Sequence, residues 1–149
     1  MAGLAFVVNA AEASTTTSLK TMLQIVAATN IRAHIKEWSC AFQGTSNTAA
    51  PILVQVYLQT GAGTSSAATI SKLDTDAAET LQTTALETFT AEPTRNDTLI
   101  MQELVHPQTG YTWQAPFGGE IPVNGGNRLG FLVTAGAAVD CTFRVVGEE

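Results

Sequence analysis

Two histidines, His34 and His106, are the side chains of this sequence best suited to bind a metal or to move a proton. A zinc site needs three or four ligands, and neither histidine has a second ligand at the short spacing that such sites use. Convergence with Glu103 or Asp140 in the folded chain stays open, as in a cupin-like metalloenzyme. The sequence also lacks the Gly-x-Ser-x-Gly elbow of a hydrolase. We therefore expect no catalytic residues, no metal, no cofactor and no enzyme activity.

Two further segments carry residue types that bind ions in other proteins. The spacing of Asp74, Asp76 and Glu79 could offer oxygen ligands to calcium, but the glycine and the later glutamate of an EF-hand loop are missing. The glycine-rich segment 61–66 has no Gly-Lys-Ser/Thr end and no helix after it, so it does not match a phosphate loop. We expect 61–66 to be a flexible loop and 74–82 to be a short helix or an ordered, solvated loop.

The two cysteines, Cys40 and Cys141, lie in separate apolar segments. Cysteine is among the most buried residue types, so two buried free thiols are the simpler interpretation. The alternative is a disulfide that ties the two segments together. Two cysteines alone do not indicate a secreted scaffold or a metal site.

The most distinctive local segment is 106–117, which carries Tyr111, Trp113 and Phe117. Its prolines and glycine make it too broken for one regular strand. Aromatic side chains on loops are common anchors of protein and carbohydrate interfaces, and this predicts an interaction surface. The alternative is that Trp113 and Phe117 fold back and cap one end of the fold.

Length and composition limit the class of protein. A chain of 149 residues is expected to form one domain. Charged residues make up 13% of it, against about 25% in average soluble domains, so we expect a partner to cover part of this neutral surface. The net charge is −6 and the basic residues are scattered, which argues against nucleic-acid binding. No segment matches a signal peptide or a membrane span, so we expect no membrane partner.

About ten short segments alternate between apolar and polar positions and are separated by turn signals. They cover residues 4–8, 18–28, 31–42, 52–59, 68–73, 84–90, 99–105, 111–113, 120–123, 128–134 and 139–146. This pattern is typical of an all-β protein with an antiparallel β-sandwich. Long connections between about 8–10 strands favour a jelly-roll-like sandwich.

The segments 31–42 and 52–59 are expected to form a central hairpin through the loop 43–51. In the first strand, the apolar residues that alternate on one face are odd-numbered up to Ile35 and even-numbered from Trp38 onward. One extra residue near Lys36 or Glu37, a β-bulge, would repair the register.

Residues 1–18 are expected to form an N-terminal arm, or a first strand, with a small-residue linker, before a single sandwich domain of residues 19–149. Its apolar side chains Leu4, Phe6 and Val8 lie in a terminal segment whose backbone groups need a sheet edge. That edge can belong to the same chain or to a neighbouring subunit.

The whole chain resembles the head decoration, or cement, proteins of tailed bacteriophages that have a jelly-roll-like fold. The resemblance depends on the small-residue arm, the Thr/Ala-rich strands, the low charge and the segments 90–94 and 106–113. It implies a structural viral protein without catalytic residues, present on the virion as a homotrimer on the outer capsid surface. It also implies that the chain is made in the host cytoplasm and binds the major capsid protein, stabilising the phage head.

Two groups of side chains are the candidate partner interface: the three aromatic residues of 106–117 and the three apolar residues of the arm. The alternative function is a carbohydrate-binding or tail-associated adhesion module, in which Tyr111, Trp113 and Phe117 would form a sugar platform.

Overall fold

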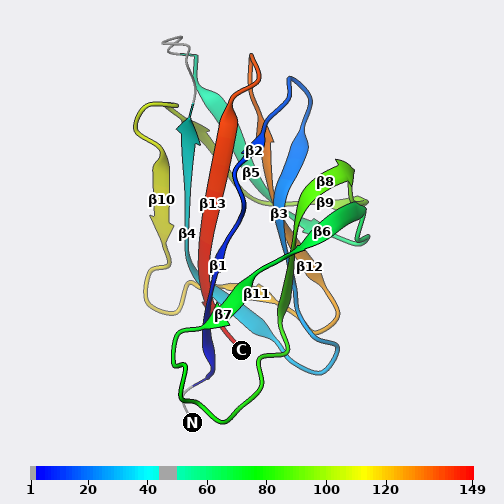
Figure 1. The fold of residues 1–149 in the computed structure, drawn as a ribbon, viewed down its shortest axis with the longest axis vertical. Coiled ribbons are helices and arrows are strands. Elements are labelled where there is room, and N and C mark those ends of the chain that lie inside the picture. Colours follow the sequence, from blue (N-terminus) through cyan, green and yellow to red (C-terminus); the bar gives the residue numbers. More distant parts are fainter. Residues whose placement is uncertain (1–2, 44–49) are drawn as a thin grey trace.

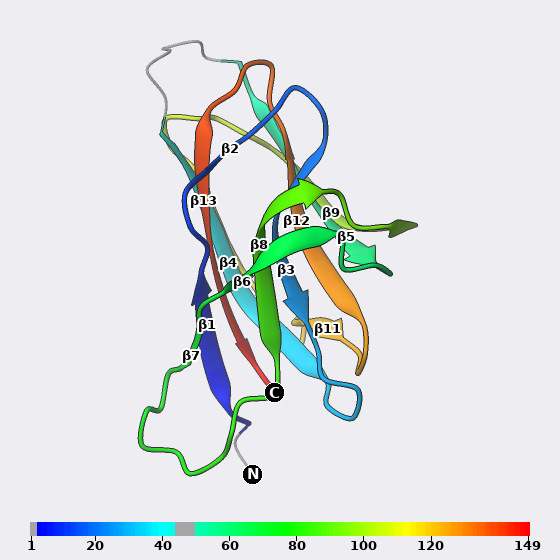
Figure 2. The same ribbon diagram turned by 45° about the vertical axis from the view of Figure 1, so that its right-hand side comes forward.

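A computed structural model describes residues 3–43 and 50–149 of the chain. Two antiparallel sheets pack face to face (Figures 1 and 2), and the described residues contain strands and loops but no helix. The expected antiparallel β-sandwich is therefore confirmed. Within the described ranges, no helix is long and apolar enough to cross a membrane.

Sheet A has seven strands and sheet B has six. The strands of sheet A are β1 (Ala5–Asn9), β2 (Ala13–Ser14), β4 (Ala33–Gln43), β7 (Ile70–Lys72), β10 (Tyr111–Gln114), β11 (Ile121–Val123) and β13 (Asp140–Glu148). The strands of sheet B are β3 (Lys20–Val26), β5 (Ile52–Gln59), β6 (Thr64–Ala68), β8 (Thr84–Ala91), β9 (Arg95–Val105) and β12 (Arg128–Thr134).

The strand order is that of a jelly roll. Sheet A runs β10-β4-β13-β1-β7, and sheet B runs β6-β8-β3-β12-β5-β9. Along the chain, β1, β3, β4 and β5 alternate between the sheets, β9 pairs beside β5, and β10, β12 and β13 alternate again. This is the pattern of two Greek keys rolled into one sandwich. The remaining short strands extend this framework, and β6, β7 and β8 are inserted between β5 and β9.

The core lies between the two inner faces and is centred on aromatic rings from both sheets. Trp38 and Phe143 of sheet A meet Phe131 of sheet B, with ring centroids 5.8 Å apart for each pair that includes Phe131. All three side chains are almost completely buried. Tilted aromatic pairs at this separation are favourable beyond the area that they bury.

The bulge in β4 is confirmed at Lys36. In the pairing of β4 with β13, Val146 lies opposite Glu37 and Gly147 lies opposite Ile35, so Lys36 has no partner. The extra residue shifts the alternation of inward and outward side chains by one position. Both Ile35 and Trp38 can therefore face the core.

The predicted central hairpin is wrong. β4 pairs with β10, β11 and β13 in sheet A, whereas β5 pairs with β12 and β9 in sheet B. The connection between β4 and β5 therefore crosses from one sheet to the other. Most of the expected loop, residues 44–49, lies outside the described residues.

One loop prediction is wrong, and of the two alternatives left open for 74–82 the structure shows the loop. The glycine-rich segment 61–66 was expected to be a loop, but β6 begins within it at Thr64 and pairs with β8. Segment 74–82 forms turns and extended loop rather than the alternative short helix. Its Asp74 side chain accepts a hydrogen bond from the Asp76 N–H at 3.1 Å, which satisfies the turn locally without helical bonds.

The centre of sheet B is buried on its outer face as well as on its inner face. The connection 92–94 joins β8 to β9. Because β8 lies next to β3 and β9 lies next to β5, this connection crosses the outer face of the strands between them. The Glu92 carboxylate accepts a hydrogen bond of 2.7 Å from the Thr21 hydroxyl. Beneath the connection, the Gln24 amide donates to Gln59 at 2.7 Å, and the Gln59 amide donates to the Thr21 hydroxyl at 2.9 Å.

Candidate interaction surfaces

Phe117 is the most exposed large apolar side chain among the described residues, and its side chain is fully accessible to solvent. It lies in a tight turn after β10, in which the Gly119 N–H donates to the Pro116 carbonyl at 2.8 Å. Gly118 has a φ of 75°, a conformation that glycine adopts without strain. The turn therefore presents one aromatic ring to solvent on an ordered backbone.

Tyr111 and Trp113 face the core instead. In the pairing of β10 with β4 they lie opposite Cys40 and Trp38, and both pack against the core as half-buried side chains. Burial raises the pKa of the Tyr111 hydroxyl, and the neighbouring Glu103 carboxylate of β9 raises it further. Tyr111 of β10 and Glu103 of β9 therefore lie close together where an edge strand of sheet A is next to an edge strand of sheet B.

The three aromatic residues do not form one exposed surface. Alternation along β10 turns Tyr111 and Trp113 inward, and the turn that follows turns Phe117 outward. The expectation that Trp113 folds back onto the fold agrees with this arrangement, but the same expectation for Phe117 is wrong. A flat sugar platform made of all three rings is not present in this conformation.

The apolar residues of the N-terminal segment belong to the chain's own sheet. β1 pairs with β13 on one side and with β7 on the other. Phe6 and Val8 are completely buried in the core, and Leu4 is half-buried. Of the two alternatives, the described residues show the first strand rather than a free arm, so Phe6 and Val8 offer no surface to a partner.

A second exposed apolar region lies on β9, the last strand of sheet B. Leu104 is 71% exposed, Leu99 40% and Ile100 38%. The alternation of 99–105 predicts an ordinary strand, and these side chains are not among the candidate interface residues that the sequence indicates. Their signal was present in the sequence, because apolar residues occupy both alternating faces of this segment.

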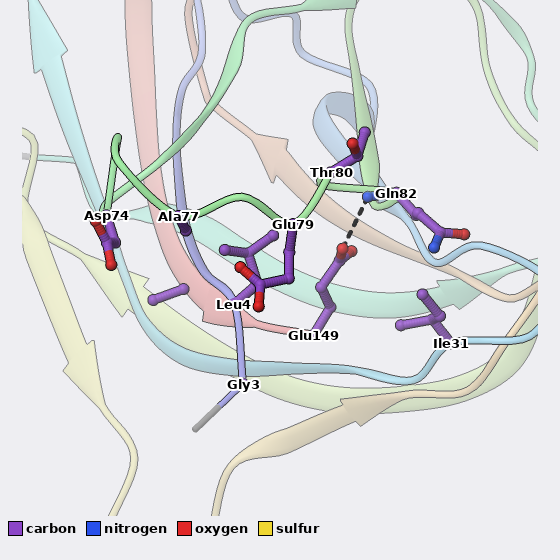
Figure 3. Close-up of a pocket in the computed structure, with 10 residues that line it drawn as sticks. Gly3, Leu4, Ile31, Asp74, Ala77, Glu79, Thr80, Gln82 and Glu149 are labelled. Atoms are coloured by element: carbon purple, nitrogen blue, oxygen red, sulfur yellow. Dashed lines mark hydrogen bonds between the residues drawn. The ribbon is translucent and has the colours of Figure 1, made fainter. Parts of the chain in front are cut away.

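A pocket of about 710 Å³ lies near the ends of β1 and β13, beneath the loop that follows β7. Figure 3 shows this loop arching from Asp74 to Gln82 over Leu4 and Glu149. The Glu149 carboxylate already accepts hydrogen bonds from the backbone N–H groups of Gln82, at 2.8 Å, and Thr83, at 2.6 Å. These bonds fasten the loop to the end of sheet A, and they give this carboxylate a structural role.

The candidate ion-binding residues do not converge. His34 is half-buried on the outer face of β4, and His106 is exposed where β9 ends. Within the described part of the chain, no group of three or more His, Cys, Asp or Glu side chains could hold a metal ion.

Both cysteines are free and buried on the inner face of sheet A. Cys40 lies opposite Phe143, and Cys141 lies opposite Phe42, so the two thiols are diagonal neighbours on adjacent strands. Burial raises the pKa of the Cys40 thiol to about 12. Burial, with a smaller effect of Cys40, also raises the pKa of Cys141.

Comparisons with models of protein families, with curated proteins and with solved structures found no match for this chain.

Proposed function

We propose that this chain is a structural viral protein that decorates a phage head. In this proposal it binds the outer surface of the major capsid lattice as a homotrimer and stabilises the shell. The resemblance of the sequence to head decoration proteins supports the proposal, and so does the jelly-roll order, which is common among viral capsid domains. Because a fold alone does not determine function, the proposal depends on a surface feature, the exposed ring of Phe117.

The Phe117 turn has the properties of a partner anchor. Burying a phenylalanine side chain contributes roughly 1.5–3 kcal/mol, which this ring has not gained within its own chain. The ordered backbone of the turn keeps the loss of conformational entropy on binding small. Aromatic anchors that insert into a pocket carry a large share of the binding free energy in many interfaces.

The low charge of the chain fits a large, closely apposed partner. A surface with 13% charged residues exposes few ionic groups that binding would have to desolvate. Since β1 is bound within its own sheet, the proposed homotrimer would form through other surfaces.

The experiment uses heads of the bacteriophage that encodes the chain, assembled without it. We expect the wild-type chain to bind these heads, and Phe117→Ala to bind about tenfold more weakly or worse, because the anchor is lost. Phe117→Tyr should keep most of the affinity. Leu73→Ala is the matched control, because Leu73 is 52% exposed on a different loop. A wild-type chain that does not bind, or equal binding by Phe117→Ala, would contradict the proposal.

A further inference from the structure

The four strands at the ends of the two sheets differ greatly in length. β7, β10 and β6 have 3, 4 and 5 residues, whereas β9 has 11. Short edge strands are one of the ways in which proteins limit pairing between molecules. In the described residues β9 pairs with β5 alone, so its other edge leaves a row of backbone N–H and C=O groups available to an added strand, and this row is regular over Met101–Val105.

β9 has some of the other features that protect an edge and lacks others. Its pairing with β5 shifts register at Ile100 and again between Leu99 and Arg95, so the regular part of the strand runs from Met101 to Val105. The segment 95–105 contains no proline. Between Thr98 and Val105 the only charged residue is Glu103, which lies on the inward side beside Tyr111. The outward side carries the exposed apolar residues Leu104, Ile100 and Leu99. An edge of this kind is a template for another extended, apolar and neutral strand.

We propose that the strand added to β9 is β9 of a second copy of this chain, in antiparallel register about a twofold axis centred on Gln102. In this register the two Gln102 side chains face each other within the regular part of the strand. Leu104 lies beside Ile100 of the second copy, twice, where the register shift of β9 begins. Apolar cross-strand pairs stabilise a sheet, and amide side chains can hydrogen-bond each other.

The charges on β9 favour one register of pairing and favour a second copy of β9 as the added strand. Each copy carries a net charge of −6, so a contact between copies needs a surface free of opposed carboxylates. Centring the pair on Glu103 would place two carboxylates opposite each other, whereas centring it on Gln102 places Glu103 beside Met101 of the second copy. The outward side chains of β9 can thus pair with the outward side chains of β9 in a second copy. This contact is separate from the Phe117 turn and goes beyond the proposed binding to the capsid.

The test is the molar mass of the full chain in solution, measured by light scattering over a wide range of concentration. The chain has a mass of 15.6 kDa. We expect wild-type assemblies to be at least twice as heavy as those of Leu104→Lys. The substitution places two ammonium groups in the paired strands, and this should weaken association about tenfold or more. Leu104 is mostly exposed, so this change should leave the fold intact. Phe117→Lys, the same kind of change at another exposed apolar residue, should keep the wild-type mass.

The mass of the Leu104→Lys variant separates this inference from the proposed function. If that variant is a trimer and the wild type is a larger assembly, both the homotrimer and the β9 contact are supported. If it is a monomer and the wild type is a dimer, the β9 contact is supported and the homotrimer is contradicted. A wild-type mass that Leu104→Lys does not change would overturn the β9 contact.

Chemical cross-linking tests the register. Gln102→Cys introduces an exposed thiol, whereas the two native thiols are buried. A short bis-maleimide should link two copies of this variant efficiently. Ser66→Cys, an exposed position on the opposite edge of sheet B, is the control and should give little dimer. Equal cross-linking of both variants would contradict the pairing.

Discussion

At the scale of single residues, neighbours in the sequence have opposite roles in the structure. Tyr111 and Trp113 complete the core, while Phe117 projects from it. The sequence predicts that this aromatic segment matters, because its composition is unusual. It does not predict which ring is exposed, since that depends on where β10 ends and which way the following turn points.

The thiols of Cys40 and Cys141 should be unreactive in the folded chain. With a pKa of about 12, the Cys40 thiol is about 10⁻⁴ ionised near pH 8, and the burial that raises this pKa also blocks access to reagent. We expect a disulfide-exchange reagent to label no thiol rapidly in native buffer. In denaturant without reductant it should label both cysteines of each chain. Fast labelling of the native chain would contradict this burial, and absence of labelling after unfolding would indicate a disulfide.

At the scale of elements, local pattern and long-range pairing differ in how well the sequence predicts them. The alternation of 128–134 predicts β12 with the observed bounds, and the parity change near Lys36 predicts the bulge. Both signals are local, because they depend on which side chains face one core. The sheet to which each strand belongs is not local, so β4 and β5 were wrongly paired with each other.

The outer face of sheet B illustrates the same limit. Gln24 and Gln59 are polar residues at positions that alternation assigns to solvent, yet both are almost completely buried. The connection 92–94 covers them, and their amides are satisfied by each other and by Thr21. A sequence pattern records the polarity of a side chain, but it does not record which distant segment crosses over that side chain.

Next to the bulge at Lys36, β13 has little space for a side chain, and this can be tested. Gly147 lies opposite Ile35 next to the bulge, and a Cβ atom added there would be 2.8 Å from the His34 carbonyl oxygen and 2.5 Å from the Phe6 ring. We expect Gly147→Ala to lower the free energy of unfolding by about 1–3 kcal/mol, because a backbone atom and a core ring must both shift. Urea denaturation followed by tryptophan fluorescence measures this change.

Gly136→Ala is the matched control for this substitution. A Cβ added at Gly136 meets no atom within 4 Å, so the change in stability should stay within about 0.5 kcal/mol. Equal stability of Gly147→Ala and the wild type would show that β13 does not approach Phe6 and His34 this closely.

At the scale of the whole molecule, the described residues place the exposed Phe117 ring and the exposed apolar side chains of β9 on separate elements. The Phe117 turn follows β10 of sheet A, and Leu99, Ile100 and Leu104 lie on β9 of sheet B. The shared core holds the two sheets that carry these features together. In the two proposals, the Phe117 turn binds the capsid and β9 binds a second copy of the chain.

The most direct test of the central claim is an electron cryomicroscopy reconstruction of the virus particle that, under the proposed function, carries this chain. We predict jelly-roll density on the outer surface of the head, bound to the major capsid protein, with the turn that carries Phe117 against the capsid. Density for this chain in the tail, or particles that lack the chain, would contradict the account.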